Sequence, residues 1–163
     1  MNTLHYDIET FLAHSIQLES EAARRFGELA DAMQSAGNRP VARLFRRLAD
    51  YSLLHLQDAR ARAAYRQLPV LKAEDFSWPG LESPEAAAIW AADPQLGPEQ
   101  ALQVALQAET SGRDFYQQVL DTTTDPEIRT LAREFVDEES AHVLELQRWA
   151  DLQRAGLPLP VEG

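Results

Sequence analysis

The sequence has no cysteine and few basic residues, and each shortage removes a class of function. Without cysteine, this chain forms no disulfide, no cysteine-ligated zinc site and no cysteine-ligated iron–sulfur cluster. It has 15 lysine and arginine residues and 26 acidic ones, which gives a formal net charge of −11. A general nucleic-acid-binding protein needs a basic surface. We therefore expect no nucleic-acid partner.

Long apolar runs are also missing, and we expect no secretory leader. No run approaches the roughly 18 apolar residues that a membrane-spanning helix requires. The first nine residues have neither a basic region nor an apolar one, so no secretory signal is expected. We expect a cytoplasmic protein without a membrane partner. Its 163 residues, of which 45% are hydrophobic, fit a single domain over 1–163.

Helical periodicity dominates what is present. Apolar residues recur every three or four positions, which is the spacing of one face of an α-helix. Proline and glycine interrupt this pattern at intervals. The fold class is therefore predicted to be all-α, with a non-helical tail over 156–163. The pattern predicts four long helices, over residues 4–36, 40–68, 98–122 and 126–154.

The connection between the second and third predicted helices is unusually long. Residues 69–97 are rich in proline and contain one short predicted helix, over 84–92, with Ser83 and Pro84 at its start. Loops of about 30 residues are uncommon in compact domains unless the topology requires one. A four-helix bundle with one long crossover connection requires it.

A faint internal repeat places polar residues on otherwise apolar helix faces. Residues 17–31 resemble residues 107–121, and a second pair of segments matches at a nearly equal offset. All the matched polar residues lie on the apolar stripes of their helices, so a bundle would bring them together in its core. The matched pairs are Glu19 with Glu109, Ser52 with Glu139, and His55 with His142.

This set of residues has a known chemical use. A lone glutamate from two helices, with Glu-x-x-His from each of the other two, is how a four-helix bundle binds two iron or manganese ions. Several buried carboxylates must either take up protons or bind a divalent cation. Carboxylate and imidazole ligands suit Fe(II) and Mn(II), and also zinc. Taken singly, each residue would be a hydrogen-bonded core histidine or a surface glutamate.

The chain resembles the di-iron domain of rubrerythrin, within the ferritin-like superfamily. The resemblance spans residues 4–152 and is carried by Glu19 with Phe26, Leu48-Ala49 before His55, Glu109 with Phe115-Tyr116, and Glu138-Glu139 before His142. It implies a ferritin-like four-helix bundle, two iron ions and a homodimer. By resemblance, Glu19 and His55 hold one iron. Glu109 and His142 hold the other, and Glu139 bridges the two.

Two departures from the family pattern bear on function. Ser52 stands where the second bridging glutamate is expected. Serine is short and neutral, so the site could be a looser site for two metals, a site for one metal, or no metal site. The cysteine-based rubredoxin module is also missing. An enzyme of this kind would therefore take electrons from a separate donor, or from the iron itself.

Three further residues have two interpretations each. Tyr116 is either a core aromatic residue or a hydrogen-bond donor to a ligating carboxylate. Asp58 and Glu145 each follow a candidate histidine by three residues. They are either acids that orient the imidazoles or exposed acids, and we favour the second interpretation because most acids lie at the surface.

The expected function is that of a non-haem di-iron oxidoreductase, in which Fe(II) reduces peroxide or O₂ as in a peroxidase or ferroxidase. Manganese and zinc are alternative metals. Two other functions stay open: a non-catalytic protein that binds or sequesters iron, and a metal-free degenerate relative that serves as an interaction protein. Peroxide-dependent oxidation of Fe(II) separates the first function from the others, and metal content separates the last.

Overall fold

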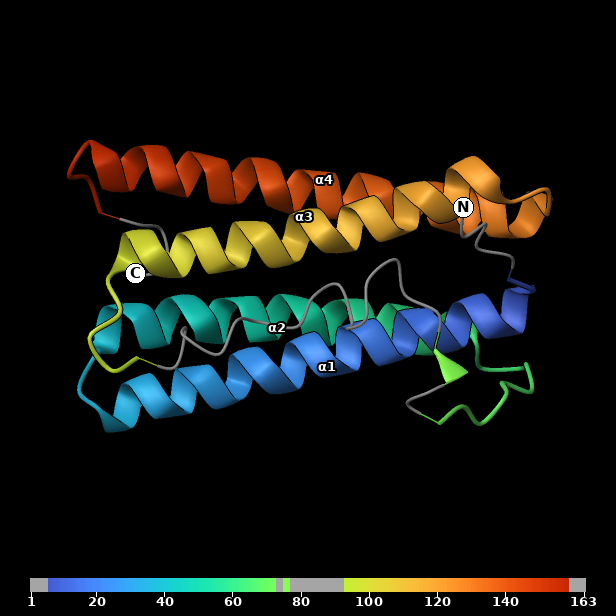
Figure 1. The fold of residues 1–163 in the computed structure, drawn as a ribbon, viewed down its shortest axis with the longest axis horizontal. Helices are drawn as coiled ribbons and strands as arrows, with labels where there is room; N and C mark the ends of the chain where they lie inside the picture. The colour runs from blue at the N-terminus through green and yellow to red at the C-terminus, as the bar shows by residue number, and fades with distance from the viewer. Residues whose placement is uncertain (1–5, 73–74, 77–92, 159–163) are drawn as a thin grey trace.

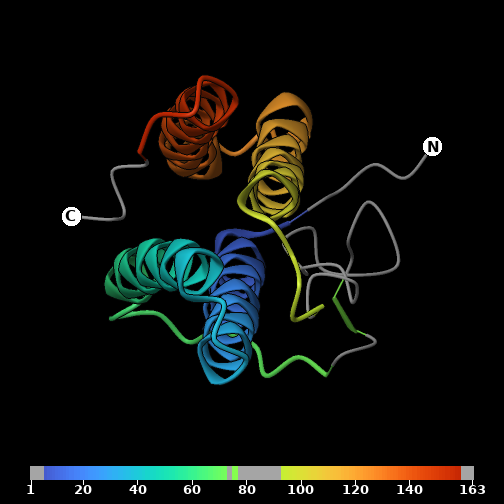
Figure 2. The ribbon, with the colours of Figure 1, turned by 90° about the vertical axis from the view of Figure 1, so that its left-hand side faces the viewer.

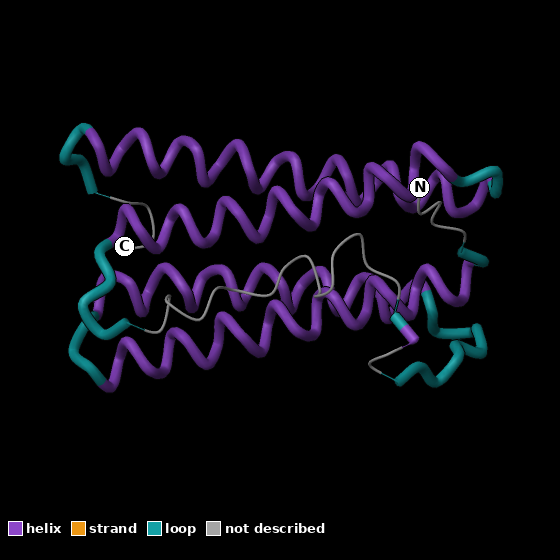
Figure 3. Tube along the Cα trace, viewed as in Figure 1, coloured by secondary structure: helices purple, strands orange, loops and turns teal. Residues whose placement is uncertain are grey.

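The computed structural model describes residues 6–72, 75–76 and 93–158. Within these residues it contains no strand and four long helices that run side by side (Figures 1 and 3). The all-α fold class is therefore confirmed. The helices are α1 (Ile8–Ser35), α2 (Arg39–Arg62), α3 (Pro98–Thr122) and α4 (Pro126–Arg154).

The helix starts follow the local sequence. The carboxylate of Asp7 accepts a hydrogen bond from the backbone N–H of Thr10 at 2.7 Å and caps α1. Asp125 caps α4 in the same way, through the N–H groups of Glu127 and Ile128, and Pro126 occupies the first turn. The observed ranges of α3 and α4 coincide with the predicted ones. The first helix begins at Ile8, later than the predicted start at residue 4, because Asp7 caps it and residues 6–7 are not helical.

The second helix is shorter than the sequence pattern predicts. α2 ends at Arg62, and a turn follows, in which the N–H of Arg66 donates to the carbonyl of Ala63 at 3.0 Å. The predicted end at residue 68 assumed that Pro69 stops the helix. The apolar stripe stops earlier, because Ala63 is buried and Tyr65 is fully exposed. A helix end with no face to bury has little to stabilise it.

Most of the connection between α2 and α3 lies outside the described residues. This applies to the short helix predicted over 84–92, which stays a prediction together with the path of the crossover. None of the helices in the described part of the chain is long and apolar enough to cross a membrane.

The helices form two antiparallel pairs that face each other. α1 packs along α2, and α3 packs along α4. The view along the bundle axis shows the two pairs stacked on one another (Figure 2). This arrangement turns the apolar stripe of every helix toward one shared interior.

The interior consists of two apolar clusters with a polar layer between them. One cluster includes Phe26, Phe45 and Trp149, and the other includes Phe11 and Phe135. On every helix the polar residues lie between the segments that contribute to the two clusters, and for α2 the second of these is Ala63, directly after the end of the helix. We call these residues the polar layer: Glu19, Ser52, His55, Glu109, Glu139 and His142.

Candidate metal centre

All four helices contribute to the polar layer, and its carboxylates are deeply buried. Glu19 on α1 is 3% exposed, Glu109 on α3 is 4% exposed, and Glu139 on α4 is 1% exposed. On α4, Glu139 and His142 are three residues apart, which places their side chains on one face of the helix. The folded chain therefore concentrates three carboxyl groups in its core, where uncompensated charge is very unfavourable.

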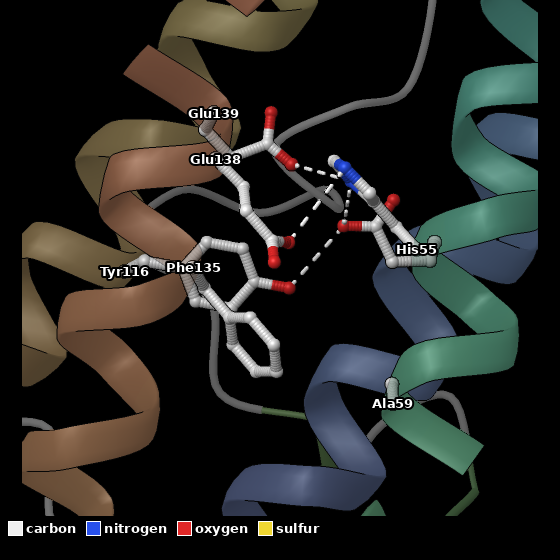
Figure 4. A pocket seen from close by; sticks show the side chains of 7 residues that line it. His55, Ala59, Tyr116, Phe135, Glu138 and Glu139 are labelled. Carbon is white, nitrogen blue, oxygen red and sulfur yellow. Dashed lines mark hydrogen bonds and ion pairs between the residues drawn. The ribbon is translucent and has the colours of Figure 1, made fainter. Parts of the chain in front are cut away.

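His55 connects carboxylates from two other helices. Its Nδ1 lies 3.2 Å from Oε1 of Glu139 and 3.5 Å from Oε1 of Glu19. The hydroxyl of Tyr116 donates to the same Glu19 oxygen at 3.4 Å. In Figure 4 the side chains of His55, Glu139 and Tyr116 point into the space between the helices. Tyr116 thus lies where the hydrogen-bonding interpretation of this residue places it.

The second histidine lies directly beside the first. Nδ1 of His142 is 3.8 Å from Oε2 of Glu109. The rings of His55 and His142 are stacked, with their centroids 4.7 Å apart and their planes 3° from parallel. One ligand atom each of His55, Glu139 and His142 lies within 4.8 Å of the other two. The two halves of the sequence repeat therefore meet in space.

Three buried polar atoms of the layer have no hydrogen-bond partner. They are Oε2 of Glu109, Oε2 of Glu139 and Nδ1 of His142. Most buried polar groups in proteins are hydrogen-bonded, so three such atoms in one layer need an explanation. Carboxylate oxygens and an imidazole nitrogen each offer a lone pair, and together they are the donor set of Fe(II), Mn(II) or Zn(II). The residues present fit a divalent metal.

The carboxyl groups do not share their charge equally. Burial raises the pKa of Glu139 well above its usual value, and the nearby charges of Glu109 and Glu19 raise it further. Burial likewise raises the pKa of Glu19. Burial acts on Glu109 in the same direction, but the interactions of Glu109 with Glu139, His142 and His55 outweigh it and lower the pKa of Glu109. Without metal, Glu139 therefore holds a proton more readily than Glu109 does.

His55 compensates part of that negative charge. Burial by itself would lower the pKa of His55. Hydrogen bonds to Glu139 and Glu19, together with their charges, outweigh burial and raise this pKa to about 11. The metal-free layer thus contains an imidazolium cation among its carboxyl groups. A metal would need a neutral imidazole and ionised carboxylates, so its binding must release protons.

The sequence-based expectations for neighbouring residues meet mixed outcomes. Ser52 is buried in the layer at 3% exposure, so α2 contributes no carboxylate there. Nε of Arg62 lies 3.6 Å from Asp58, and Glu145 accepts a hydrogen bond from the hydroxyl of Tyr51 at 3.3 Å. Both acids therefore have partners other than the histidines that precede them.

Sequence reasoning missed Glu138 and Tyr51, which both lie against candidate ligands. Oε2 of Glu138 is 3.8 Å from Nε2 of His55. The ring of Tyr51 stacks on that of His142, with the centroids 4.8 Å apart. Neither residue lies on the apolar stripe of its helix. The only available signal was their position next to stripe residues in the sequence.

The chain is similar to known proteins in sequence and in fold. The family model described as Rubrerythrin matches residues 10–150. The chain belongs to the rubrerythrin family. Its bundle is similar to the crystal structure of an uncharacterized conserved protein from Magnetospirillum magnetotacticum MS-1. The two chains are 32% identical, with a TM-score of 0.71 over 95% of this chain and 98% of the other. No curated protein matches the chain.

Family membership confirms the resemblance and the ferritin-like bundle that it implied. The matched range 10–150 also contains every residue of the polar layer. Within the polar layer, Ser52 stands where the resemblance predicts a glutamate.

Proposed function

We propose that this rubrerythrin-family protein binds Fe(II) in its polar layer and uses it to reduce peroxide or O₂. The observation that carries the proposal is the set of three buried atoms without hydrogen-bond partners, in a layer built by all four helices. Manganese and zinc suit the same donor set. Five side chains would hold the metal: Glu19, His55, Glu109, Glu139 and His142.

Each residue of this chain would have a defined role in such a site. Glu19 and His55 would hold one ion, and Glu109 and His142 the other. Glu139 lies within reach of both histidines and would bridge the ions. When bound, two Fe(II) ions would each supply one of the two electrons needed to convert peroxide and two protons into two water molecules, and both would become Fe(III). The buried carboxylates would stabilise the increased positive charge of the oxidised metal.

The surroundings of the layer would support this chemistry. Tyr116 donates a hydrogen bond to Glu19 and so fixes the position of one carboxylate. The apolar clusters on both sides limit the access of water, which strengthens electrostatic interactions inside the layer. The chain has no cysteine with which to hold an iron–sulfur or rubredoxin-type centre of its own. Electrons would come from a separate donor, or from the iron itself, and the protein would act as a homodimer.

The first experiment is anaerobic titration with Fe(II), followed by addition of peroxide. We expect one or two iron ions per chain, measured by elemental analysis after removal of unbound metal. The melting temperature should rise with iron concentration, because the metal binds only the folded state. The gain is about 2.7 kcal/mol at a free iron concentration 100 times Kd. Addition of hydrogen peroxide should then oxidise bound Fe(II) faster than free Fe(II).

The outcomes of this titration separate the three candidate functions. Bound iron that peroxide oxidises no faster than free Fe(II) would indicate sequestration rather than catalysis. No bound metal, and no change in melting temperature with Fe(II), Mn(II) or Zn(II), would contradict the metal proposal. A metal-free interaction protein would then be the better description.

Replacement of Ser52 by glutamate tests whether the site is a two-metal centre that lacks one bridge. Ser52 lies three residues before His55 on α2, so the new carboxylate would enter the polar layer beside that imidazole. We expect Ser52→Glu to raise the affinity for a second metal and to speed Fe(II) oxidation. The larger side chain should also destabilise the metal-free protein by about 1–3 kcal/mol through overpacking.

Ser52→Gln is the matched control, because it adds nearly the same volume without the charge. Both variants should melt below the unsubstituted protein when metal is absent, and Ser52→Glu should gain more stability from metal than Ser52→Gln gains. Equal iron stoichiometry in all three proteins, with a loss of stability in every metal state, would favour a one-metal or metal-free site.

A further inference from the structure

The imidazole of His55 lies between two neighbouring glutamates of α4. Its Nδ1 faces Oε1 of Glu139 at 3.2 Å, and its Nε2 faces Oε2 of Glu138 at 3.8 Å. Figure 4 shows Glu138 and Glu139 approaching the ring from the same helix. The two carboxylates differ in environment, since the side chain of Glu139 is 1% exposed and that of Glu138 is 42% exposed.

The chemistry of imidazole decides which nitrogen could bind a metal. A neutral imidazole has one N–H group and one nitrogen with a free lone pair, and only the second can ligate. Nδ1 of His55 faces the polar layer, where it approaches Glu139 and Glu19. A metal held by the layer would therefore bind Nδ1. The remaining proton of His55 would have to stay on Nε2, which faces Glu138.

We propose that Glu138 is a positioning residue that accepts the Nε2–H of His55 and so presents Nδ1 to the metal. The inference rests on the proposed function of the polar layer. A carboxylate that holds the second nitrogen of a ligating histidine fixes both the tautomer and the orientation of the ring. The present 3.8 Å separation is that of an ion pair, and the half-exposed Glu138 side chain has room to close it to a hydrogen bond.

Glu138 does not replace the bridging carboxylate that is missing at Ser52. It approaches the ring at Nε2, whereas the other carboxylates approach at Nδ1. The unpartnered atoms of the layer belong to Glu109, Glu139 and His142, and none belongs to Glu138. Glu138 thus acts through His55. Its loss should weaken chiefly the binding of the ion that His55 holds.

The test uses Zn(II) as a redox-inert, diamagnetic probe of the full chain. Zinc affinity is measured by competition with a chelator in the unsubstituted protein, Glu138→Gln and Glu138→Ala. Ring nitrogen resonances of the zinc-loaded proteins, from long-range ¹H–¹⁵N spectra, report which nitrogen of His55 binds zinc and how fast its Nε2–H exchanges with water. Glu134→Gln is the matched control. Glu134 lies on the same helix, is also 42% exposed, and pairs with Arg62 instead of a histidine.

We expect both Glu138 variants to lower the affinity for one zinc ion by about 10–100-fold. In both, the Nε2–H signal of His55 should broaden and exchange faster with water, because its carboxylate acceptor has been removed. Glu134→Gln should leave both readouts unchanged. Melting temperatures of the metal-free variants show whether each is folded.

Three results would overturn the inference. If the unsubstituted protein binds zinc and the Glu138 variants bind it equally well, Glu138 has no positioning role and the proposed function stands. If affinity falls while the Nε2–H signal is unchanged, Glu138 acts through its charge alone. If the unsubstituted protein binds no Zn(II), Fe(II) or Mn(II), the proposed function fails, and this inference fails with it.

Discussion

Replacement of Glu139 by glutamine is expected to stabilise the metal-free protein and to remove tight metal binding. Burial and the neighbouring Glu109 raise the pKa of Glu139 well above its ordinary value of 4.5. Folding at pH 7 must therefore either protonate this carboxyl group or bury its charge. Glutamine has the same shape and requires neither. The gain is at most roughly 3 kcal/mol at pH 7, which is the cost of protonating an ordinary glutamate at that pH.

Metal affinity should respond in the opposite direction. Loss of a carboxylate that merely supports a ligand lowers metal affinity by about 10–100-fold, and Glu139 is the proposed bridging ligand itself. We expect a loss of more than about 100-fold in competition with a chelator. Urea denaturation of both metal-free proteins measures the stability change. Glu145→Gln, on the same helix but hydrogen-bonded to Tyr51, is the control and should change neither quantity greatly.

This variant is informative because the stability of the metal-free protein should rise while metal affinity falls. A merely structural buried glutamate would lose hydrogen bonds on substitution, so the fold would weaken and metal binding would stay as it was. That result would place Glu139 outside the metal site.

The metal-free protein is also expected to gain stability as the pH falls from about 8 to about 5. Burial raises the pKa values of Glu19 and Glu139, so the folded state binds more protons than the unfolded state above their ordinary value of 4.5. His55 acts in the same direction. Its stabilising effect is fully present below its unfolded value of 6.5 and is lost as the pH rises toward about 11. Each proton contributes up to about 1.4 kcal/mol per pH unit.

Glu109 sets the lower end of this window. Its interactions with Glu139, His142 and His55 outweigh burial and lower its pKa, so its contribution is complete above 4.5 and disappears as the pH falls further. Stability should therefore stop rising near that pH. The metal-loaded protein should show the reverse trend over the same range, because protons compete with the metal for the same atoms.

Urea denaturation at pH 8, 7, 6 and 5 measures both trends, with a chelator present for the metal-free protein and with zinc for the loaded one. Lower net charge also reduces general repulsion as the pH falls. Glu139→Gln isolates the contribution of the layer, because it should lower the slope by up to one proton. A metal-free protein that loses stability between pH 8 and pH 5 would contradict the assigned protonation states.

Much of the fold could be predicted because its signals are local. The Gly97-Pro98 and Asp125-Pro126 pairs mark the starts of α3 and α4, and both helices have the predicted ranges. The second helix was predicted too long, because Pro69 was taken as its stop. Burial decided the end instead, and the apolar stripe of α2 stops at Ala63.

The candidate site could be predicted only in part, for a geometric reason. Periodicity shows which residues share a face of one helix, so it grouped Glu139 with His142. It does not show how far a helix is rotated against its neighbour. Glu138 reaches His55, and Tyr51 reaches His142, because of the way in which α2 and α4 face each other. Such contacts become visible only once the helices are packed.

The polar layer also has a consequence for the cooperativity of the fold. It separates two apolar clusters, and each of the four helices crosses it near the middle. Dispersion and the hydrophobic effect hold each cluster together, but neither acts strongly across a layer of carboxyl groups and imidazoles. In the metal-free chain, the two halves of the bundle can therefore open with different free energies. A metal held by all the layer's ligands would join the four helices at one level, so that the bundle unfolds as a single unit.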